Sequence, residues 1–276
     1  MRVHRAWIVA GAGFIALLAA AAIRATFGVL MMPLMDEFGW SRATVSSAAS
    51  LNLVVFGLSA PFAAALVERL GLRRVVAAAL ALIGACAAGM TQISQPWQLY
   101  LLWGLLAGAA TGAVAPVLAA MIAGRWFSAR RGLVVGLLTA ANSTGQLIFL
   151  PLMTHLVEHG WRWTMAVVGG AAAVALALAG ALLRDRPADV GLTPFGGEAE
   201  PSTAGPRPSA LGVLRVVGGD PTFLALAASF FVCGATTVGL IAVHLIPAAH
   251  DHGIPATAAA SMMAAMGVLD IAGTTG

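Results

Sequence analysis

The chain has 276 residues, of which 60% are hydrophobic and only 9% are charged, and its formal net charge is +4. Soluble domains carry about 25% charged residues, so this composition excludes a soluble globular protein and indicates an integral membrane protein. All 15 of the strongly basic residues are arginines, and they stand in short groups between apolar runs. This arrangement suits membrane orientation better than binding of nucleic acid, which we do not expect as a partner.

Eight apolar runs are long enough to cross about 30 Å of hydrocarbon as helices. Alanine and glycine are abundant inside them, unlike in lipid-facing barrel strands, which alternate over about ten residues. We therefore predict an all-α polytopic membrane protein with about eight transmembrane helices. The runs cover residues 6–35, 43–67, 74–94, 98–123, 132–156, 163–183, 221–247 and 256–276.

The arginines set the predicted orientation of these helices. With the N-terminus inside, twelve arginines fall in cytoplasmic segments, whereas the external loops hold only Arg42 and Arg162. Cytoplasmic loops of membrane proteins carry such an excess of basic residues. We predict a multi-pass protein of the cell inner (cytoplasmic) membrane with a cytoplasmic N-terminus, so the lipid bilayer is one of its partners.

Residues 184–220 differ in composition from everything around them. They hold five prolines and, from Asp185 to Glu200, four acids. We predict a largely disordered cytoplasmic linker, with a six-helix bundle over 1–183 before it and two helices over 221–276 after it. Six helices followed by two suggest the beginning of a 6+6 protein with twelve helices. We therefore expect a C-terminally truncated fragment that does not transport by itself.

The turn between the second and third apolar runs reads "AALVERLGLRR" (64–74). It resembles the loop signature Gly-x-x-x-Asp-Arg-x-Gly-Arg-Arg of the major facilitator superfamily, with Glu68 for the Asp, Arg69 for the first Arg, Gly71 for the second Gly and Arg73 for the last Arg. An acid and several arginines can latch helix ends together in one of two states. The resemblance implies that these four residues form a conformational gate; the alternative is a basic anchor that only sets orientation.

A second stretch, "RWFSARRGLVVGLLTAANSTG" (125–145), has an aromatic pair, then two arginines, then glycines spaced by four. It is similar to the region between the fourth and fifth helices of the monocarboxylate-porter and oxalate/formate-antiporter branch. The stretch "FGVLMMPLMDEFGWSRATVS" (27–46) resembles the same branch. These resemblances imply a major facilitator fold and secondary transport of a small organic anion, by proton symport or by exchange.

Arg24 lies inside the first apolar run, about 22 Å from the cytoplasmic side by helical rise and so past the midplane. A charge near the centre of a bilayer costs at least about 2.5–3.5 kcal/mol. We expect Arg24 to face a water-filled cavity and to bind a substrate carboxylate through two hydrogen bonds. The alternative is a structural ion pair inside the bundle.

Four other polar residues lie deep in the predicted helices. The amides of Asn142 and Gln146, one turn apart, and of Asn52 suit either contact with substrate oxygens or hydrogen bonds between helices. Asp270 is the second intramembrane charge. The resemblance to monocarboxylate porters implies that Asp270 carries the coupling proton.

Other functions are less well supported by the sequence. Efflux of a hydrophobic drug or metabolite is the nearest alternative, with Arg24 only structural. A receptor or scaffold derived from a transporter is another. A membrane enzyme would need a catalytic constellation at one interface, and the external histidines are the only candidates. We expect no enzyme, no catalytic residues, no cofactor and no metal, and a monomer that acts on a small molecule.

Overall fold

The computed structural model describes residues 4–197 and 210–275, with a few side chains in the helices left out, among them those of residues 270–275. Within these ranges the chain is almost entirely helical, and its one β-bridge joins Phe127 to Phe195. The elements in chain order are α1 (Arg5–Phe38), α2 (Arg42–Leu70), α3 (Leu72–Met90), α4 (Pro96–Leu99), the π-helix η1 (Tyr100–Ala107), α5 (Gly108–Trp126), α6 (Arg131–Val157), α7 (Trp161–Leu182), the 3-10 helix η2 (Pro187–Val190), α8 (Ala210–Val217), α9 (Pro221–Gly234), the π-helix η3 (Ala235–Ala242), α10 (Val243–Asp251) and α11 (Ala256–Thr275).

The predicted all-α membrane architecture is confirmed. Among the described residues, seven helical rods are long and apolar enough to cross a membrane, and α11 adds a shorter apolar helix. One rod, Pro96–Trp126, joins α4, η1 and α5, and another, Pro221–Asp251, joins α9, η3 and α10. Each predicted apolar run therefore corresponds to one helical rod, and the total agrees with the prediction of about eight.

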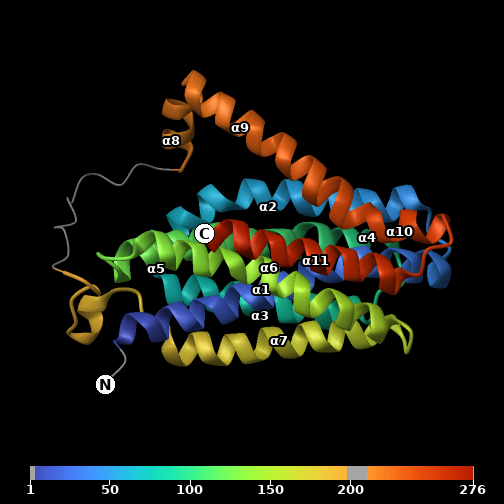
Figure 1. Cartoon of the computed structure of the whole chain (residues 1–276), viewed down its shortest axis with the longest axis horizontal. Helices are drawn as coiled ribbons and strands as arrows, with labels where there is room; N and C mark the ends of the chain where they lie inside the picture. Colours follow the sequence, from blue (N-terminus) through green and yellow to red (C-terminus); the bar gives the residue numbers. More distant parts are fainter. Residues whose placement is uncertain (1–3, 198–209, 276) are drawn as a thin grey trace.

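Helix α1 runs lengthwise through the bundle and packs against α5, α6 and α7 (Figure 1). Its buried residues occur on all sides and include many alanines. Small residues let helices approach closely in lipid, where apolar side chains gain little by leaving the hydrocarbon. At the α1–α6 crossing there is no room for a Cβ on Gly145, because it would collide with Ala21. This close crossing brings Arg24 of α1 beside Asn142 of α6.

A second close crossing joins α2 to the η1–α5 rod. A Cβ on Gly108 would lie 2.8 Å from the carbonyl oxygen of Asn52, and one on Gly112 would collide with the carbonyl oxygen of Phe56. A backbone oxygen cannot rotate away as a side chain can. The glycines spaced by four therefore fix the position of α2 along α5.

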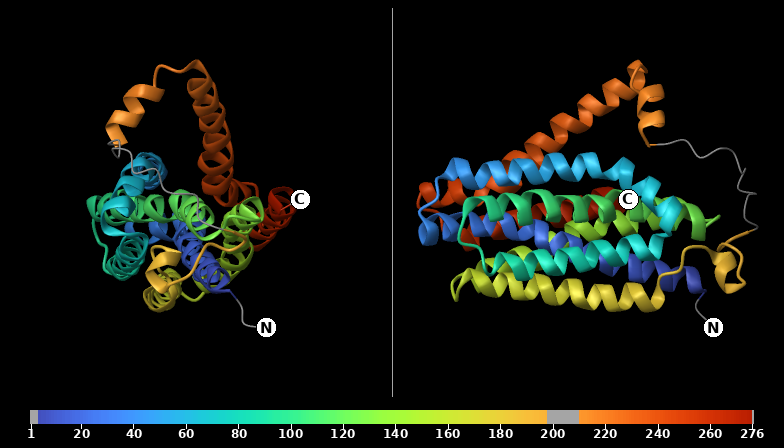
Figure 2. Two further views of the ribbon diagram at one scale, coloured as in Figure 1. Left: turned by 90° about the vertical axis from the view of Figure 1, so that its left-hand side faces the viewer. Right: turned by 180° about the vertical axis from the view of Figure 1, so that it is seen from behind.

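The last helices lie against only part of this bundle. Helix α11 packs along α6 and α10 packs against α1, whereas α9 diverges from the bundle toward the end where α1 begins (Figures 1 and 2). We call this the N-terminal end. At the opposite end, Arg42 of α2 forms two hydrogen bonds with the carboxylate of Asp251, of 2.8 and 3.1 Å. This ion pair joins α2 to α10.

The expected disorder of the 184–220 linker is wrong for residues 184–197, and Ala210–Val217 of the same stretch form helix α8. The backbone of Phe195 bonds to the carbonyl of Trp126 and the N–H of Ser128, each at 2.9 Å. Its ring packs edge-on against Trp7 at a centroid distance of 5.8 Å. An aromatic residue and free backbone groups at the bundle end thus order this segment, which composition alone did not reveal. The division into two bundles joined by a linker stays a prediction.

The glycine contacts predict opposite effects for two substitutions in α5. Gly112→Ala forces α2 away from α5. We therefore expect it to lower the free energy of unfolding, measured by thermal unfolding in detergent, by about 1–3 kcal/mol. Gly124→Ala is the matched control, since a Cβ there meets nothing within 4 Å. It removes the conformational freedom of a helical glycine and should stabilise by about 0.5–1 kcal/mol. Equal stability of the two variants would contradict the proposed close contact.

Candidate binding cavity

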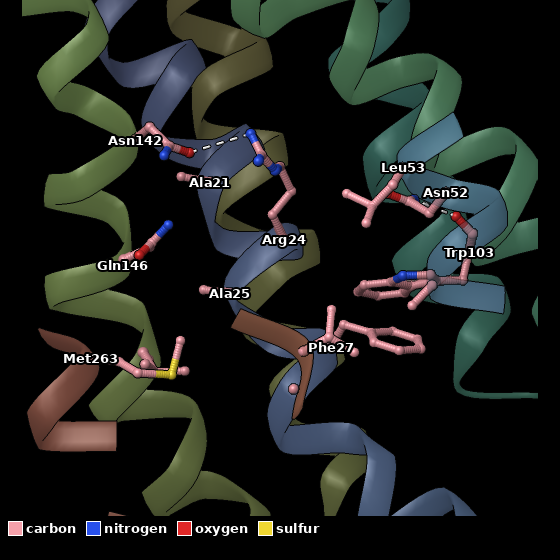
Figure 3. Close-up of a pocket in the computed structure, with 14 residues that line it drawn as sticks. Ala21, Arg24, Ala25, Phe27, Asn52, Leu53, Trp103, Asn142, Gln146 and Met263 are labelled. Carbon is pink, nitrogen blue, oxygen red and sulfur yellow. Dashed lines mark hydrogen bonds between the residues drawn. The ribbon is translucent and has the colours of Figure 1, made fainter. Parts of the chain in front are cut away.

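A cavity of about 60 Å³ lies between α1, α2, η1 and α6. All four predicted substrate-binding residues, Arg24, Asn52, Asn142 and Gln146, line it (Figure 3). The helices after the predicted linker also contribute, through Val243 of α10 and Met263 of α11. One water needs a cavity of about 10–15 Å³, so this space is large enough for several waters or one small organic molecule.

The guanidinium of Arg24 is held from two sides by uncharged groups. One nitrogen, Nη1, donates a long hydrogen bond of 3.4 Å to Oδ1 of Asn142. Its central carbon, Cζ, lies 4.7 Å from the centroid of the Phe56 ring. The ion pairs among the described side chains all join other residues. Within this part of the chain, therefore, no carboxylate neutralises Arg24.

The amide of Asn52 forms a hydrogen bond between helices. Its Nδ2 donates to the carbonyl oxygen of Trp103 at 2.7 Å, and Trp103 belongs to the π-helical segment η1. The indole of Trp103 in turn lies against the ring of Phe27 at a centroid distance of 5.0 Å. Asn52 thus ties α2 to η1 and fixes an aromatic wall of the cavity, which is one of the two roles that its sequence position allowed.

Gln146 lies one turn after Asn142 on α6, so both amides point to the same side of the helix. Its amide is directed into the cavity (Figure 3), where the described hydrogen bonds give it no partner. Asp270 belongs to α11, but its side chain lies outside the described residues. Its assignment as the proton carrier stays a prediction.

The four predicted gate residues lie at the N-terminal end, between α2 and α3. Glu68 forms an ion pair with Arg125 at the end of α5. Gly71 has a φ of +91°, and a Cβ there would lie 2.6 Å from the carboxylate of Asp185. That carboxylate accepts the backbone N–H of Arg73 at 2.8 Å, at the start of α3 where a negative charge is favourable. The side chains of Arg69 and Arg73 are exposed.

Sequence reasoning thus missed two residues that contact the gate, Arg125 and Asp185. Arg125 opens the 125–145 stretch, and the predicted topology already placed it on the same side of the membrane as Glu68. That shared side was the available signal. Asp185 stood in the segment predicted to be disordered, and nothing in its neighbourhood pointed to the turn between α2 and α3.

Comparison with known proteins identifies the family. The model of the Major Facilitator Superfamily matches residues 13–275. The chain belongs to the Major Facilitator Superfamily. This superfamily member is 25% identical to the MFS-type transporter YcxA of Bacillus subtilis, covering 97% of the chain and 63% of that protein. It is 30% identical to monocarboxylate transporter 11 of Mus musculus, covering 96% of the chain and 56% of the transporter.

A solved structure supports the fold. The crystal structure of a D-xylose-proton symporter aligns with a TM-score of 0.63 at 13% identity, over 97% of this chain and 66% of that one. The chain thus spans less than two thirds of the length of each of these three proteins. The resemblance to the superfamily is confirmed, and its fold is that of transporters, not of enzymes.

The contact between Glu68 and Arg125 predicts an energetic coupling at the N-terminal end. In a double-mutant cycle of Glu68→Gln and Arg125→Gln, thermal unfolding should show a coupling of at least about 0.5 kcal/mol. Each single change leaves the other charge unpaired, whereas the double variant does not. The control is a second cycle that combines Glu68→Gln with Arg69→Gln in place of Arg125→Gln. The side chain of Arg69 is exposed, so the effects of these two changes should be additive. Additivity of Glu68 and Arg125 would show that the pair contributes nothing to stability.

Proposed function

We propose that this protein is a secondary transporter of a small organic anion, in particular a carboxylate, and that Arg24 binds the anion. The observation that carries this proposal is the environment of the Arg24 guanidinium. Arg24 belongs to a helix of membrane-spanning length and lines a cavity between helices, and no described carboxylate pairs with it. A charge at membrane depth is costly. A substrate anion that enters the cavity would compensate that charge while it is bound.

The other walls of the cavity suit such a substrate. The planar guanidinium offers parallel N–H donors that match the two oxygens of a carboxylate. The amides of Asn142 and Gln146 can bond a further oxygen, and Phe27, Trp103 and Met263 offer apolar surface to a short carbon chain. Small-molecule sites commonly combine apolar walls with a few converging polar groups. The relatives named monocarboxylate transporters support the same class of substrate.

Transport would proceed by alternating access. The helices before the predicted linker and those after it form two sets. The two sets are joined at the opposite end by the ion pair of Arg42 and Asp251, while α9 diverges at the N-terminal end (Figure 2). The N-terminal end would lie in the cytoplasm, which the arginine distribution supports, and the protein would lie in the inner membrane. The gate at the N-terminal end would consist of Glu68, Arg69, Gly71 and Arg73. Coupling would occur by proton symport through Asp270 or by exchange of anions.

Anion binding by Arg24 predicts a ligand-dependent thermal shift. The purified chain in detergent is heated with sodium acetate, isobutyrate, benzoate or succinate, with sodium chloride at equal ionic strength as the reference. At a ligand concentration of about 100 times Kd, we expect one class of carboxylate to raise the melting temperature by about 5 °C. Arg24→Gln should abolish the shift, because it removes the charge and the paired donors.

The matched control for this experiment is Arg74→Gln, an equal change at an exposed arginine that should keep the native shift. A shift that persists in Arg24→Gln would contradict the assignment of Arg24. Stabilisation of both forms by uncharged hydrophobic compounds, with no response to carboxylates, would instead favour the efflux of hydrophobic cargo.

The ligand-free stability of Arg24→Gln separates the two roles that the sequence left open. Breaking a buried ion pair by removing one partner costs about 3–5 kcal/mol. If Arg24 is an uncompensated anion receptor, its replacement by a neutral amide should leave the free energy of unfolding within about 1 kcal/mol of native, or raise it. Thermal or chemical unfolding in detergent measures this difference. A loss near the ion-pair value would assign Arg24 a structural role.

A further inference from the structure

We propose that Phe56 is a positioning residue for Arg24, which its ring holds by a cation–π contact that leaves the charge of the guanidinium available to a carboxylate. This inference rests on the proposed function of Arg24 as the anion-binding group. It adds a residue of α2 that the sequence pattern did not single out and that does not itself line the cavity.

The geometry of the contact carries the inference. The Cζ of Arg24 lies 4.7 Å from the ring centroid of Phe56, within the range at which a ring face attracts a cation. The ring of Phe56 carries no charge and no oxygen acceptor. This contact therefore holds the cation without neutralising it. The single described hydrogen bond of the group, to Asn142 at 3.4 Å, uses one donor weakly.

A carboxylate in the place of the ring would act in the opposite way. It would occupy two of the in-plane donors and neutralise the charge, so a substrate would have to displace it. An aromatic ring stabilises the cation by attraction to its quadrupole without carrying a charge of its own. Arg24 can therefore be held in one orientation and remain able to bind an anion.

The position of Phe56 is itself fixed by the backbone. The carbonyl of Phe56 lies where a Cβ on Gly112 would collide, and the carbonyl of Asn52, one turn earlier, lies against Gly108. The amide of Asn52 adds a hydrogen bond of 2.7 Å to Trp103. This turn of α2 cannot slide along η1 and α5. The ring therefore has a fixed position along α1, next to Arg24.

The test replaces the ring and measures carboxylate affinity by thermal-shift titration of the purified chain. The probes are acetate, isobutyrate, benzoate and succinate, as for native protein. We expect Phe56→Leu to weaken binding by about fivefold to thirtyfold, which corresponds to the loss of a cation–π contact at a partly desolvated site. Phe56→Tyr and Phe56→Trp should retain native affinity or exceed it, because they restore the ring face.

Phe62→Leu is the matched control, since it makes the same change six residues later in α2 at a side chain that is 52% exposed. It should bind the probes like native protein. The ligand-free melting temperature of each variant is recorded as well. A purely structural role of Phe56 would lower that temperature in Phe56→Leu without changing affinity, and the Tyr variant keeps the test informative if the Leu variant fails to fold.

The outcomes separate this inference from the proposed function. If native protein binds a carboxylate, Arg24→Gln does not, and Phe56→Leu binds like native, the anion site stands and the role of Phe56 is overturned. If Phe56→Tyr and Phe56→Trp bind as weakly as Phe56→Leu, close packing and not the ring face holds Arg24, which also overturns it. If no carboxylate stabilises native protein, both proposals fail together.

Discussion

The helices of this bundle pack around the positive charge of Arg24, which lies at membrane depth. No described carboxylate lies beside it. Among the described residues, Arg24 is neither part of an ion pair nor exposed at the protein surface. The guanidinium instead contacts an amide oxygen from α6 and a ring face from α2, and its remaining donors border a small cavity. Each of these contacts stabilises the cation while leaving its charge intact, which is the condition for binding an anion there.

This arrangement requires close helix packing. Asn142 reaches Arg24 because α1 and α6 cross where Ala21 meets Gly145, and Phe56 reaches it because the backbone of α2 rests on Gly112. A larger residue at either crossing would move a whole helix and, with it, that helix's contact with the guanidinium. The small-residue stripes that lower the barrier to close approach in lipid therefore also set the geometry of the cavity.

The sequence predicted the parts of this structure that depend on one helix at a time. Apolar length located each membrane helix, and the cost of a buried charge singled out Arg24. Spacing of one turn placed Asn142 and Gln146 on one face, and both line the cavity with Arg24. The sequence did not predict Phe56, Arg125 or Asp185, because their importance depends on how far one helix is shifted along another. An aromatic residue in an apolar run carries no sign that a cation will lie over its ring.

Among the described residues, the ion pair that reaches beyond the first six membrane helices lies at the opposite end, and its place bears on how the protein would change conformation. At the N-terminal end, Glu68 and Arg125 join α2 to α5, and Asp185 holds the start of α3; all of these lie before residue 198. At the opposite end, Glu37 and Arg162 join α1 to α7, within the first six membrane helices, whereas Arg42 and Asp251 join α2 to α10, across the two sets of helices. Contacts of the first kind would keep the first six membrane helices together as one body. A contact of the second kind, exposed and therefore weak in water, would have to break when the two sets move apart. Under the proposed transport cycle, opening the cavity at the opposite end would thus break this exposed ion pair and loosen the packing of α10 against α1 and of α11 against α6, while Arg24, Asn142 and Phe56 stay together on helices of a single body.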